Sequence, residues 1–369
     1  MHLGLDASRA TAARRTGTER YALRLIQAML ASAATHSVRL YFRDPPAPDL
    51  FPDTPGVHRR VIPFPRLWTH VRLAWELAAH RPRPDLLFVP AHVLPLVCPV
   101  PAVVTVHDLG YRHFPDAHPP GQRLYLDLST RYSALSAAHV IADSQATRRD
   151  LVRFYGVPEA KITVVYPGRD EALRRVDPAP VRAKYDLPER YILHVGTLQP
   201  RKNLVRLMEA VRRQPSAVGL VLAGRRGWLS GPILEAARLH APRVRVLDYA
   251  PDDDLPGLYS GAAVFAFPSL YEGFGFPVLE AMACGVPVVC ADTASLPEVA
   301  GAAALRVDPL DVGALAEALT RVLTDDGLRA ELTARGLEQI RRFSWERAAR
   351  ETWAVLERLV APTRYGKAG

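Results

Sequence analysis

The sequence has 369 residues, which is enough for two domains that each bury most of their unfolded surface. Hydrophobic residues make up 49% and charged residues 23%, a composition that excludes a disordered or fibrous protein. The net charge is +9, with 23 basic against 15 acidic residues up to position 175 and 24 against 23 beyond it. This N-terminal excess fits either a solvated basic face or contact with an anionic membrane or acceptor.

The cysteines and the N-terminus bear on the compartment. Cys98, Cys284 and Cys290 are an odd number in apolar surroundings and lack the paired spacing of a zinc site or disulfide framework. The N-terminus has no charged segment followed by an apolar stretch, and no run of 18 apolar residues occurs. We therefore expect a cytoplasmic protein in a reducing compartment, with neither a secretion signal nor a transmembrane span.

Short apolar runs rich in β-branched residues alternate with helical stretches through the first half of the chain. They cover residues 2–5, 38–42, 86–89, 102–106, 139–142 and 162–165. This alternation is typical of a parallel sheet covered by helices. The segment 168–188 that follows is charged, contains several prolines and has no clear period, so we expect it to link two domains.

A second series of apolar runs begins after this linker, at residues 191–195, 219–223, 244–247, 263–267 and 287–290. It predicts a second doubly wound sheet, in which ligands bind where strands end. Near the C-terminus, residues 344–359 carry apolar side chains at helical spacing, which predicts an amphipathic helix. The apolar positions are Trp345, Ala348, Ala349, Trp353 and Leu356. The predicted class is α/β, with two Rossmann-like domains.

The strongest site signal is the segment from Tyr271 to Gly285. Glu272 ends a predicted strand, and the glycine-rich turn with Gly273 and Gly275 leads into a helix that starts near Pro277, a residue suited to the first helical turn. Backbone donors at such a helix start, those of Phe276, Val278 and Leu279, can hold a diphosphate or sugar hydroxyls. Glu280 can accept hydrogen bonds from two ribose hydroxyls.

A second anion site is predicted after the run 191–195. There Arg201 and Lys202 follow the turn Gly196-Thr197 and precede a helix, so two cations converge with a helix N-terminus. A solvated helix start is the alternative. Glu272 lies among phenylalanines, including Phe274, and must be hydrogen-bonded there, to a sugar hydroxyl or to a local backbone N–H.

Three further features each allow a structural and a functional interpretation. His107 follows the run 102–106 and is either a satisfied core histidine or a functional one. Ser144 faces an acceptor or caps a helix. The segment 64–77 holds Trp68 and Trp75 among arginines and either packs on the sheet or touches a membrane or lipid acceptor.

Taken together, these motifs resemble the retaining glycosyltransferases of family 4, whose hallmark is two glutamates separated by seven residues, as Glu272 and Glu280 are. Residues 196–203, from Gly196 through Asn203, resemble the donor-phosphate segment of that family, and residues 105–109 its acceptor-side histidine loop. The resemblance covers nearly the whole chain. It includes the start of the last helix at residues 343–345, which in the family crosses back to the N-terminal domain.

The resemblance implies a GT-B fold in which two Rossmann-like domains face a cleft. We place an acceptor-side domain at 1–172, a nucleotide-sugar-binding domain at 173–345 and the returning helix at 346–369. The resemblance gives His107 a role near the donor sugar and implies a glycine-rich turn at the donor phosphate between Arg9 and Glu19, where this chain has only Gly17.

The expected site has a catalytic group of His107, Arg201, Lys202 and Glu272. Donor binding is assigned to Gly17, Gly196, Thr197, Asn203, Tyr249, Phe274, Gly275, Phe276, Val278, Leu279 and Glu280, with the base near residues 247–249. By resemblance, the reaction is a front-face substitution with retention, in which the departing diphosphate accepts the acceptor proton.

We expect a hexosyltransferase that uses a nucleotide-diphosphate sugar such as GDP-mannose or a UDP-sugar, without a cofactor. No Asp-any-Asp motif precedes the expected cleft, so we also expect metal independence. The acceptor would be a saccharide or a lipid-linked saccharide, with peripheral contact to an anionic membrane and no nucleic acid. Two alternatives stay open, a GT-B sugar-nucleotide epimerase and a non-catalytic basic binding protein.

Overall fold

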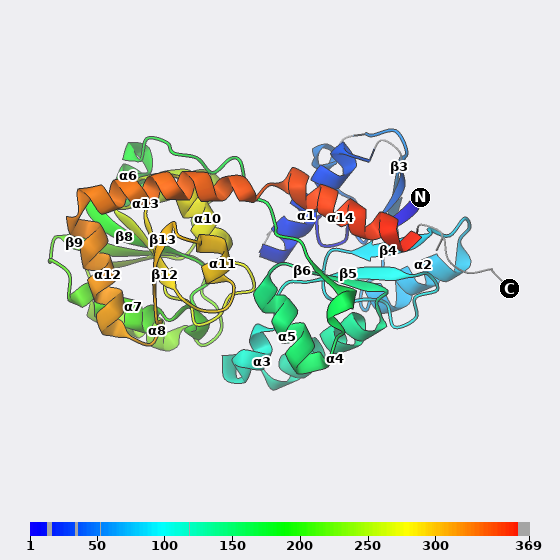
Figure 1. The fold of residues 1–369 in the computed structure, drawn as a ribbon, viewed down its shortest axis with the longest axis horizontal. Coiled ribbons are helices and arrows are strands. Elements are labelled where there is room, and N and C mark those ends of the chain that lie inside the picture. The colour runs from blue at the N-terminus through cyan, green and yellow to red at the C-terminus, as the bar shows by residue number, and fades with distance from the viewer. Residues whose placement is uncertain (13–16, 34–35, 52, 118, 361–369) are drawn as a thin grey trace. The chain divides into compact units, whose positions relative to one another are not determined.

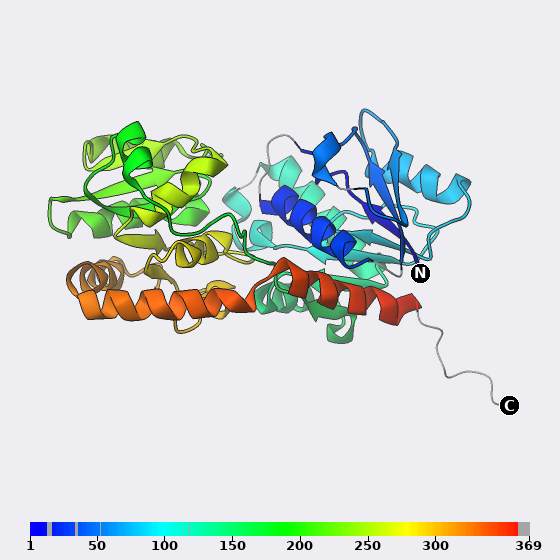
Figure 2. The ribbon, with the colours of Figure 1, turned by 90° about the horizontal axis from the view of Figure 1, so that it is seen from above.

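The computed structural model describes residues 1–12, 17–33, 36–51, 53–117 and 119–360 (Figure 1). The chain divides into two compact units. The first unit comprises Met1–Leu109, Leu124–Gly168 and the segment that begins at Ser344, and the second comprises Gly110–Arg123 and Arg169–Phe343. Each unit contains one parallel sheet with helices on both of its faces (Figures 1 and 2).

The sheet of the first unit has seven strands in the order β3-β2-β1-β4-β5-β6-β7. Six of the strands coincide with the predicted apolar runs, and β3 was not predicted because its middle residues, His58 to Arg60, are exposed and polar. The strands are β1 His2–Asp6, β2 Ser37–Phe42, β3 Val57–Val61, β4 Leu86–Val89, β5 Ala102–Val106, β6 His139–Ala142 and β7 Ile162–Val164.

The helices of the first unit include the amphipathic helix predicted near the C-terminus. They are α1 Gly17–Ala31, α2 Ala74–Ala79, α4 Pro120–Ser136, α5 Gln145–Tyr155 and α14 Trp345–Val360. Helix α14 lies beside α1 (Figure 1). The Nε1–H of Trp353 donates to Met29 O at 3.2 Å, and the ring of Trp345 meets that of Tyr21 edge-on. The last helix therefore packs on the N-terminal sheet unit, as the family resemblance implied.

The sheet of the second unit has six strands in the order β10-β9-β8-β11-β12-β13. The edge strand β13 was not predicted, and its two middle residues, Leu305 and Arg306, are not buried. The strands are β8 Arg190–Val195, β9 Val218–Ala223, β10 Val244–Leu247, β11 Val264–Phe267, β12 Val288–Ala291 and β13 Ala304–Val307. Because β8 continues to β9 on one side while β11 continues to β12 on the other, the strand order reverses between β8 and β11, the position where such sheets bind ligands.

Helices cover both faces of this second sheet. They are α6 Ala179–Tyr185, α7 Leu204–Arg212, α8 Gly231–Leu239, α9 Leu255–Ser260, α10 Phe276–Ala283, α11 Leu296–Ala300, α12 Val312–Thr324 and α13 Asp326–Gln339, with the short α3 Gly110–His113 grouped in the same unit. On one face, Leu207 and Val211 of α7 pack with Leu315 and Leu319 of α12 over the strands. This core fixes the strand ends on which the site is built.

The predicted α/β class with two Rossmann-like parallel sheets is confirmed. All three cysteines are free thiols. Within the described part of the chain, every helix is too short or too polar to cross a bilayer.

Candidate functional site

The sequence-predicted cations and Glu272 come together at the reversal point of the second sheet. Arg201 and Lys202 lie in the loop that follows β8, and Glu272 lies in the loop that follows β11. Because β8 and β11 are hydrogen-bonded neighbours, their carboxyl ends lie at the same edge of the sheet. Two segments about 70 residues apart in sequence thereby form one cluster.

The two cations grip the carboxylate directly. Lys202 Nζ lies 2.6 Å from Glu272 Oε1, and Arg201 Nη1 lies 2.9 Å from Glu272 Oε2. Glu272 and Lys202 are only 7% and 6% exposed. Each carboxylate oxygen thus faces a different cation, and the contact with Lys202 is a charge-assisted hydrogen bond, the strong class of such bonds. We call Arg201, Lys202 and Glu272 the ion triad.

The electrostatics of the ion triad favour an ionised carboxylate. Burial by itself raises the pKa of Glu272, but the charges of Arg201 and Lys202 outweigh it and lower that pKa to about 2. Two cations and one anion leave the cluster with a net positive charge. The cluster can therefore accept an anionic group without changing its own protonation.

Protein contacts fix the backbone of the Glu272 loop. Ser295 Oγ lies 2.9 Å from Glu272 O and 2.6 Å from Phe274 O, and the Arg201 guanidinium donates to Tyr271 O. Gly275 has φ +116°, and a Cβ there would lie 2.8 Å from Leu296 Cδ2, so this turn requires glycine.

Asn203 braces the same edge rather than pointing outward. Its Nδ2 donates to Pro268 O at 3.1 Å and to Pro309 O at 2.6 Å, while its Oδ1 accepts from Arg206 at 3.0 Å. The side chain, predicted to bind the donor, thus joins the loops that follow β8, β11 and β13. Gly196 borders Lys202, whereas Thr197 is exposed.

The side chains of the remaining residues at the predicted helix start mostly pack inside the protein. Phe274 is buried, with its ring edge-on to Phe276. The side chains of Val278 and Leu279 are fully buried, and the Val278 N–H donates to Gly275 O at 3.0 Å. Any contact that Val278 or Leu279 makes to a ligand would therefore come from its backbone.

Two more predicted donor residues lie farther along this unit. Glu280 is buried in α10, and its Oε2 accepts from the Tyr259 hydroxyl at 2.8 Å. Tyr249 follows β10, is 55% exposed and stacks under the Arg225 guanidinium at 5.2 Å. An exposed aromatic ring that already binds a planar cation is suited to stack on a planar base.

His107, in the first unit, is paired to a carboxylate that the prediction did not include. Its Nδ1 donates to Asp143 Oδ2 at 2.7 Å, and Tyr21 packs edge-on at 4.7 Å. Burial lowers the pKa of His107, but Asp143 outweighs burial and raises it above the ordinary value. The two residues follow the neighbouring strands β5 and β6, and Asp143 directly precedes the singled-out Ser144. Their pairing became visible only once the strand order was known.

The other residues singled out in the first unit are Ser144, Gly17 and the segment 64–77. Ser144 caps α5, with its Oγ accepting from Thr147 N at 3.0 Å. Gly17 begins α1, while the turn before it, residues 13–16, lies outside the described residues. In the segment 64–77, Trp68 is buried and donates to Ile62 O, whereas Trp75 is 55% exposed. Packing thus explains part of that segment.

Two other places in the second unit carry charged side chains. The expectation that no Asp-any-Asp motif precedes the cleft is wrong for the run Asp252 to Asp254, but Asp254 bonds to Lys184 and Tyr185. No cluster of three or more metal-ligating side chains able to hold an ion occurs in the described ranges.

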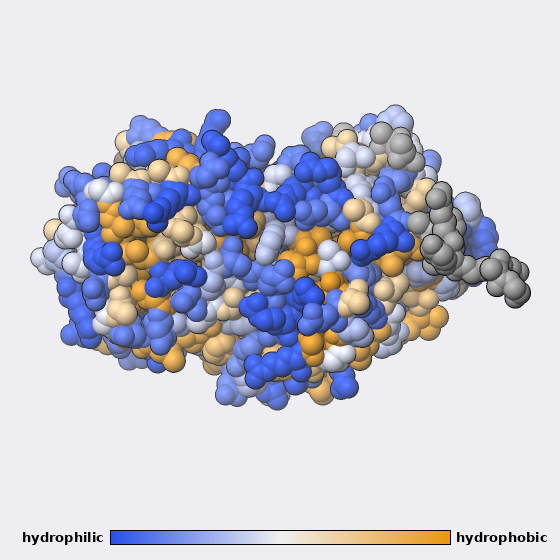
Figure 3. Space-filling model, viewed as in Figure 1, coloured by the Kyte–Doolittle hydropathy of each residue, from blue (hydrophilic) through white to orange (hydrophobic). Residues whose placement is uncertain are grey.

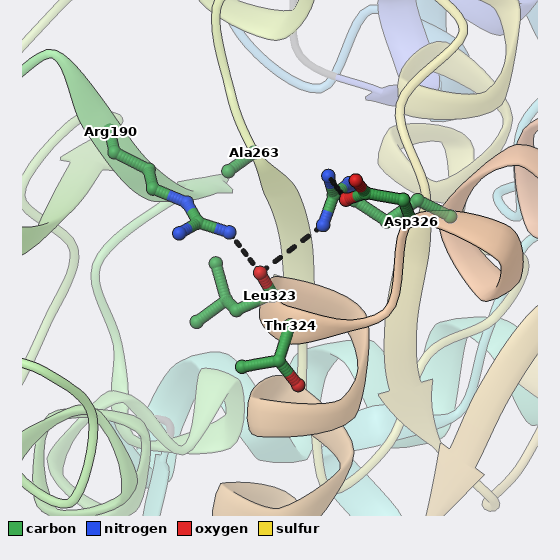
Figure 4. A pocket seen from close by; sticks show the side chains of 6 residues that line it. Arg190, Ala263, Leu323, Thr324 and Asp326 are labelled. Carbon is green, nitrogen blue, oxygen red and sulfur yellow. Dashed lines mark hydrogen bonds and ion pairs between the residues drawn. The ribbon is translucent and has the colours of Figure 1, made fainter.

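The second place is a pocket of about 570 Å³ at the amino end of the sheet, away from the ion triad. Its arginines, Arg190 and Arg329, donate to Leu323 O at the end of α12 (Figure 4). Both arginines thus cap the C-terminal end of α12, and Arg329 also pairs with Asp326, which supports a structural role for this pocket.

Comparison with known proteins decides the family. Residues 15–173 match Glycosyltransferase Family 4 and residues 180–339 match Glycosyl transferases group 1. The chain is 39% identical over 261 residues to O-antigen chain mannosyltransferase B of Escherichia coli, covering 68% of each chain. The chain belongs to glycosyltransferase family 4.

Solved structures agree on the fold. Sucrose-phosphate synthase from Thermosynechococcus elongatus matches with a TM-score of 0.76 at 24% identity, over 98% of this chain and 100% of that one. HepE of Anabaena, solved in complex with UDP and glucose, also has a TM-score of 0.76, at 19% identity over 97% and 100%. The family 4 resemblance and the glycosyltransferase class are confirmed by the two family matches and the 39% identical relative.

The lowered pKa of Glu272 predicts a pH-dependent contribution to stability. A carboxyl group whose pKa is depressed on folding stabilises the protein above its ordinary pKa, here 4.5, and loses that effect as the pH falls towards 2. We expect Glu272→Gln to lower the free energy of unfolding by about 3 kcal/mol from pH 8 to 5. The difference should shrink between pH 4.5 and 2, as measured by urea unfolding.

Asp248→Asn is the matched control, because it breaks an exposed ion pair with Arg226. It should cost about 1 kcal/mol or less. A Glu272→Gln effect that is equally small at pH 7 would contradict the assigned burial and pairing.

Proposed function

We propose that this glycosyltransferase transfers a hexose of mannose or glucose type from a nucleotide-diphosphate sugar to a saccharide or lipid-linked acceptor in cell-surface polysaccharide or glycoconjugate synthesis. The observation that carries the proposal is the ion triad at the reversal point of the second sheet. The relative from Escherichia coli is an O-antigen chain mannosyltransferase, which supports both the mannose class and the polysaccharide context.

The donor roles follow from charge and burial. Arg201 and Lys202 together exceed the charge of Glu272, so they can take the diphosphate while Glu272 turns one oxygen to a sugar hydroxyl. Glu280, held by Tyr259, lies in the helix that follows and accepts from the ribose. The base stacks on the exposed ring of Tyr249. The planar Arg225 guanidinium over that ring supports this role, because it shows that the ring can take a flat group. A UDP complex of HepE supports UDP as one donor nucleotide, beside GDP.

The proposed chemistry is a front-face substitution with retention. The bond from the anomeric carbon to the diphosphate oxygen breaks, the bond to the acceptor oxygen forms on the same face, and the acceptor proton passes to the departing diphosphate. Charge develops on that diphosphate, so the two triad cations stabilise the transition state more than the ground state. His107, whose Nδ1 is held by Asp143, presents Nε2 to the transferred sugar. No metal ion takes part in the proposed reaction.

Product analysis tests the reaction. We expect GDP-mannose or a UDP-hexose to raise the melting temperature by mass action, and the hexose to appear on a saccharide acceptor in the α configuration of the donor when followed by NMR. Turnover should continue in EDTA. A β-linked product would refute retention, loss of turnover in EDTA with rescue by magnesium would refute metal independence, and an epimerised nucleotide sugar formed without acceptor would refute transfer.

Removal of either cation of the ion triad should strongly slow the chemical step. We expect Arg201→Ala and Lys202→Ala each to lower kcat/KM about 100-fold or more, because each removes a charge aimed at the leaving group. Lys184→Ala is the matched control, since Lys184 pairs with Asp254 at the surface. Initial rates within a few-fold of wild type for both triad variants would end the assignment.

The membrane proposal concerns the first unit and its exposed apolar helix face. We propose that the protein is cytoplasmic and touches an anionic membrane through α4, where Leu124, Leu128 and Leu135 are 58%, 57% and 43% exposed. The exposed Arg131 lies on the same helix, and Lys161 donates to Leu135 O. Apolar residues are interspersed with polar ones over the face that carries α4 (Figure 3). Leucines flanked by cations suit an anionic bilayer surface.

Vesicle sedimentation tests this contact. We expect the double variant Leu124→Ser/Leu128→Ser to bind phosphatidylglycerol-containing vesicles about tenfold or more weakly. The two serines bury much less apolar surface in the bilayer than the leucines do. Leu239→Ser, which changes a leucine 73% exposed in the second unit, should bind as wild type. Equal binding of the double variant and wild type would refute the surface.

A further inference from the structure

A buried histidine beneath the ion triad was not part of the predicted site. His194 lies near the end of β8 and is fully buried. Its Nδ1 lies 3.0 Å from Ala266 O. A carbonyl oxygen only accepts, so Nδ1 carries the proton and Nε2 presents a lone pair when the ring is neutral.

The surroundings keep this ring neutral. Burial, helped by the charge of Lys202, lowers the pKa of His194 to about 3. The ring is stacked against Phe267, with centroids 5.4 Å apart and planes 17° apart. A single tautomer in a single orientation is therefore held over the neutral pH range.

His194 Nε2 and the Lys202 ammonium group both lie close to Gly196. Nε2 has no hydrogen-bond partner among the described residues. It lies 3.4 Å from the point that a Cβ of Gly196 would occupy, and Lys202 Cε and Nζ lie 3.5 and 3.7 Å from the same point. The space beside Gly196, which has no side chain, thus has both an acceptor nitrogen and an ammonium donor at its border. A buried acceptor is costly unless it is used.

The ammonium group can donate to more than one acceptor. Lys202 Nζ has three N–H donors, of which one goes to Glu272, and the group also lies over the Phe267 ring at 4.8 Å. In the proposed function, Glu272 turns an oxygen towards the sugar when the diphosphate arrives. The ammonium group then needs a fixed acceptor on the protein side if it is to keep its place.

We propose that His194 is a positioning residue for Lys202, whose Nε2 lone pair holds the ammonium group, directly or through one water in the Gly196 gap, while the donor diphosphate is bound. The inference rests on the proposed function of Lys202. His194 touches neither the sugar nor the diphosphate. It acts through the place of one cation and, by staying neutral, adds no charge of its own.

The test is a double-mutant cycle with UDP-glucose and GDP-mannose as probes. We expect His194→Phe, which keeps the stacked ring and loses the lone pair, to lower kcat/KM for the better donor about tenfold or more. The same change in a Lys202→Met background should have almost no further effect, because the group that His194 positions is gone. His194→Gln, which retains an acceptor, should recover part of the loss.

The controls separate this inference from the proposed function. His139→Phe removes a buried strand histidine of the first unit, bonded to Thr163, and should leave the donor KM unchanged. If Lys202→Met alone leaves donor binding and turnover intact, the proposed function fails. If Lys202→Met is harmful but the His194→Phe loss is the same in both backgrounds, the proposed function stands and the positioning role is overturned.

A spectroscopic measurement applies even if His194→Phe does not fold. In wild-type protein labelled with ¹⁵N-histidine, the His194 ring should show the neutral form with the proton on Nδ1. Addition of UDP-glucose or GDP-mannose should shift the Nε2 resonance towards a hydrogen-bonded acceptor. A resonance that does not respond to a saturating donor, or the opposite tautomer, would refute the inference.

Discussion

The second unit depends on one buried carboxylate that neutralises two cations. Without Glu272, Arg201 and Lys202 would place two like charges at one sheet edge with little water to screen them, a costly arrangement. With it, the edge is stable in the free protein and still carries one uncompensated positive charge. The same residues can thus hold the loops together before a donor arrives and bind an anion afterwards.

The first unit contains a similar device in a different chemical form. His107 and Asp143 follow neighbouring parallel strands, as the members of the ion triad do, and the carboxylate raises the pKa of its partner. In both units, strand adjacency brings together side chains that are far apart in the sequence. The two clusters differ in their chemical groups. The ion triad contains a guanidinium and an ammonium group, whereas the first unit has an imidazole whose Nδ1 is bonded to Asp143.

Much of this arrangement could be predicted from the sequence because buried parallel strands are continuous apolar runs and because motifs follow their ends. The glutamate spacing and the basic pair after β8 predicted side chains at the carboxyl edge of the second sheet, where Arg201, Lys202 and Glu272 lie together. Strands β3 and β13 could not be found this way, since edge strands such as Val57–Val61 alternate too little between apolar and polar residues.

Side-chain pairings also could not be predicted from the sequence, because they depend on the order of the strands. Nothing in the residues around Asp143 indicated that it holds His107, and nothing around Asn203 indicated that its amide joins the loops at Pro268 and Pro309. His194 was hidden for a related reason. Inside an apolar strand it resembles an ordinary core residue, and only the fold brings its ring nitrogen and the Lys202 ammonium group to the same glycine, Gly196.

The hydroxyl of Ser295 has a consequence for altering sugar selectivity. By reaching both Glu272 O and Phe274 O, it ties the backbone of the Glu272 loop to the start of α11, so that loop has little freedom to adopt a new shape. Engineering for a different donor would do better to vary the outward-facing Thr197 or Tyr249. Under the proposed donor binding, changes there would alter side chains that contact the nucleotide sugar and leave the backbone held by Ser295 intact.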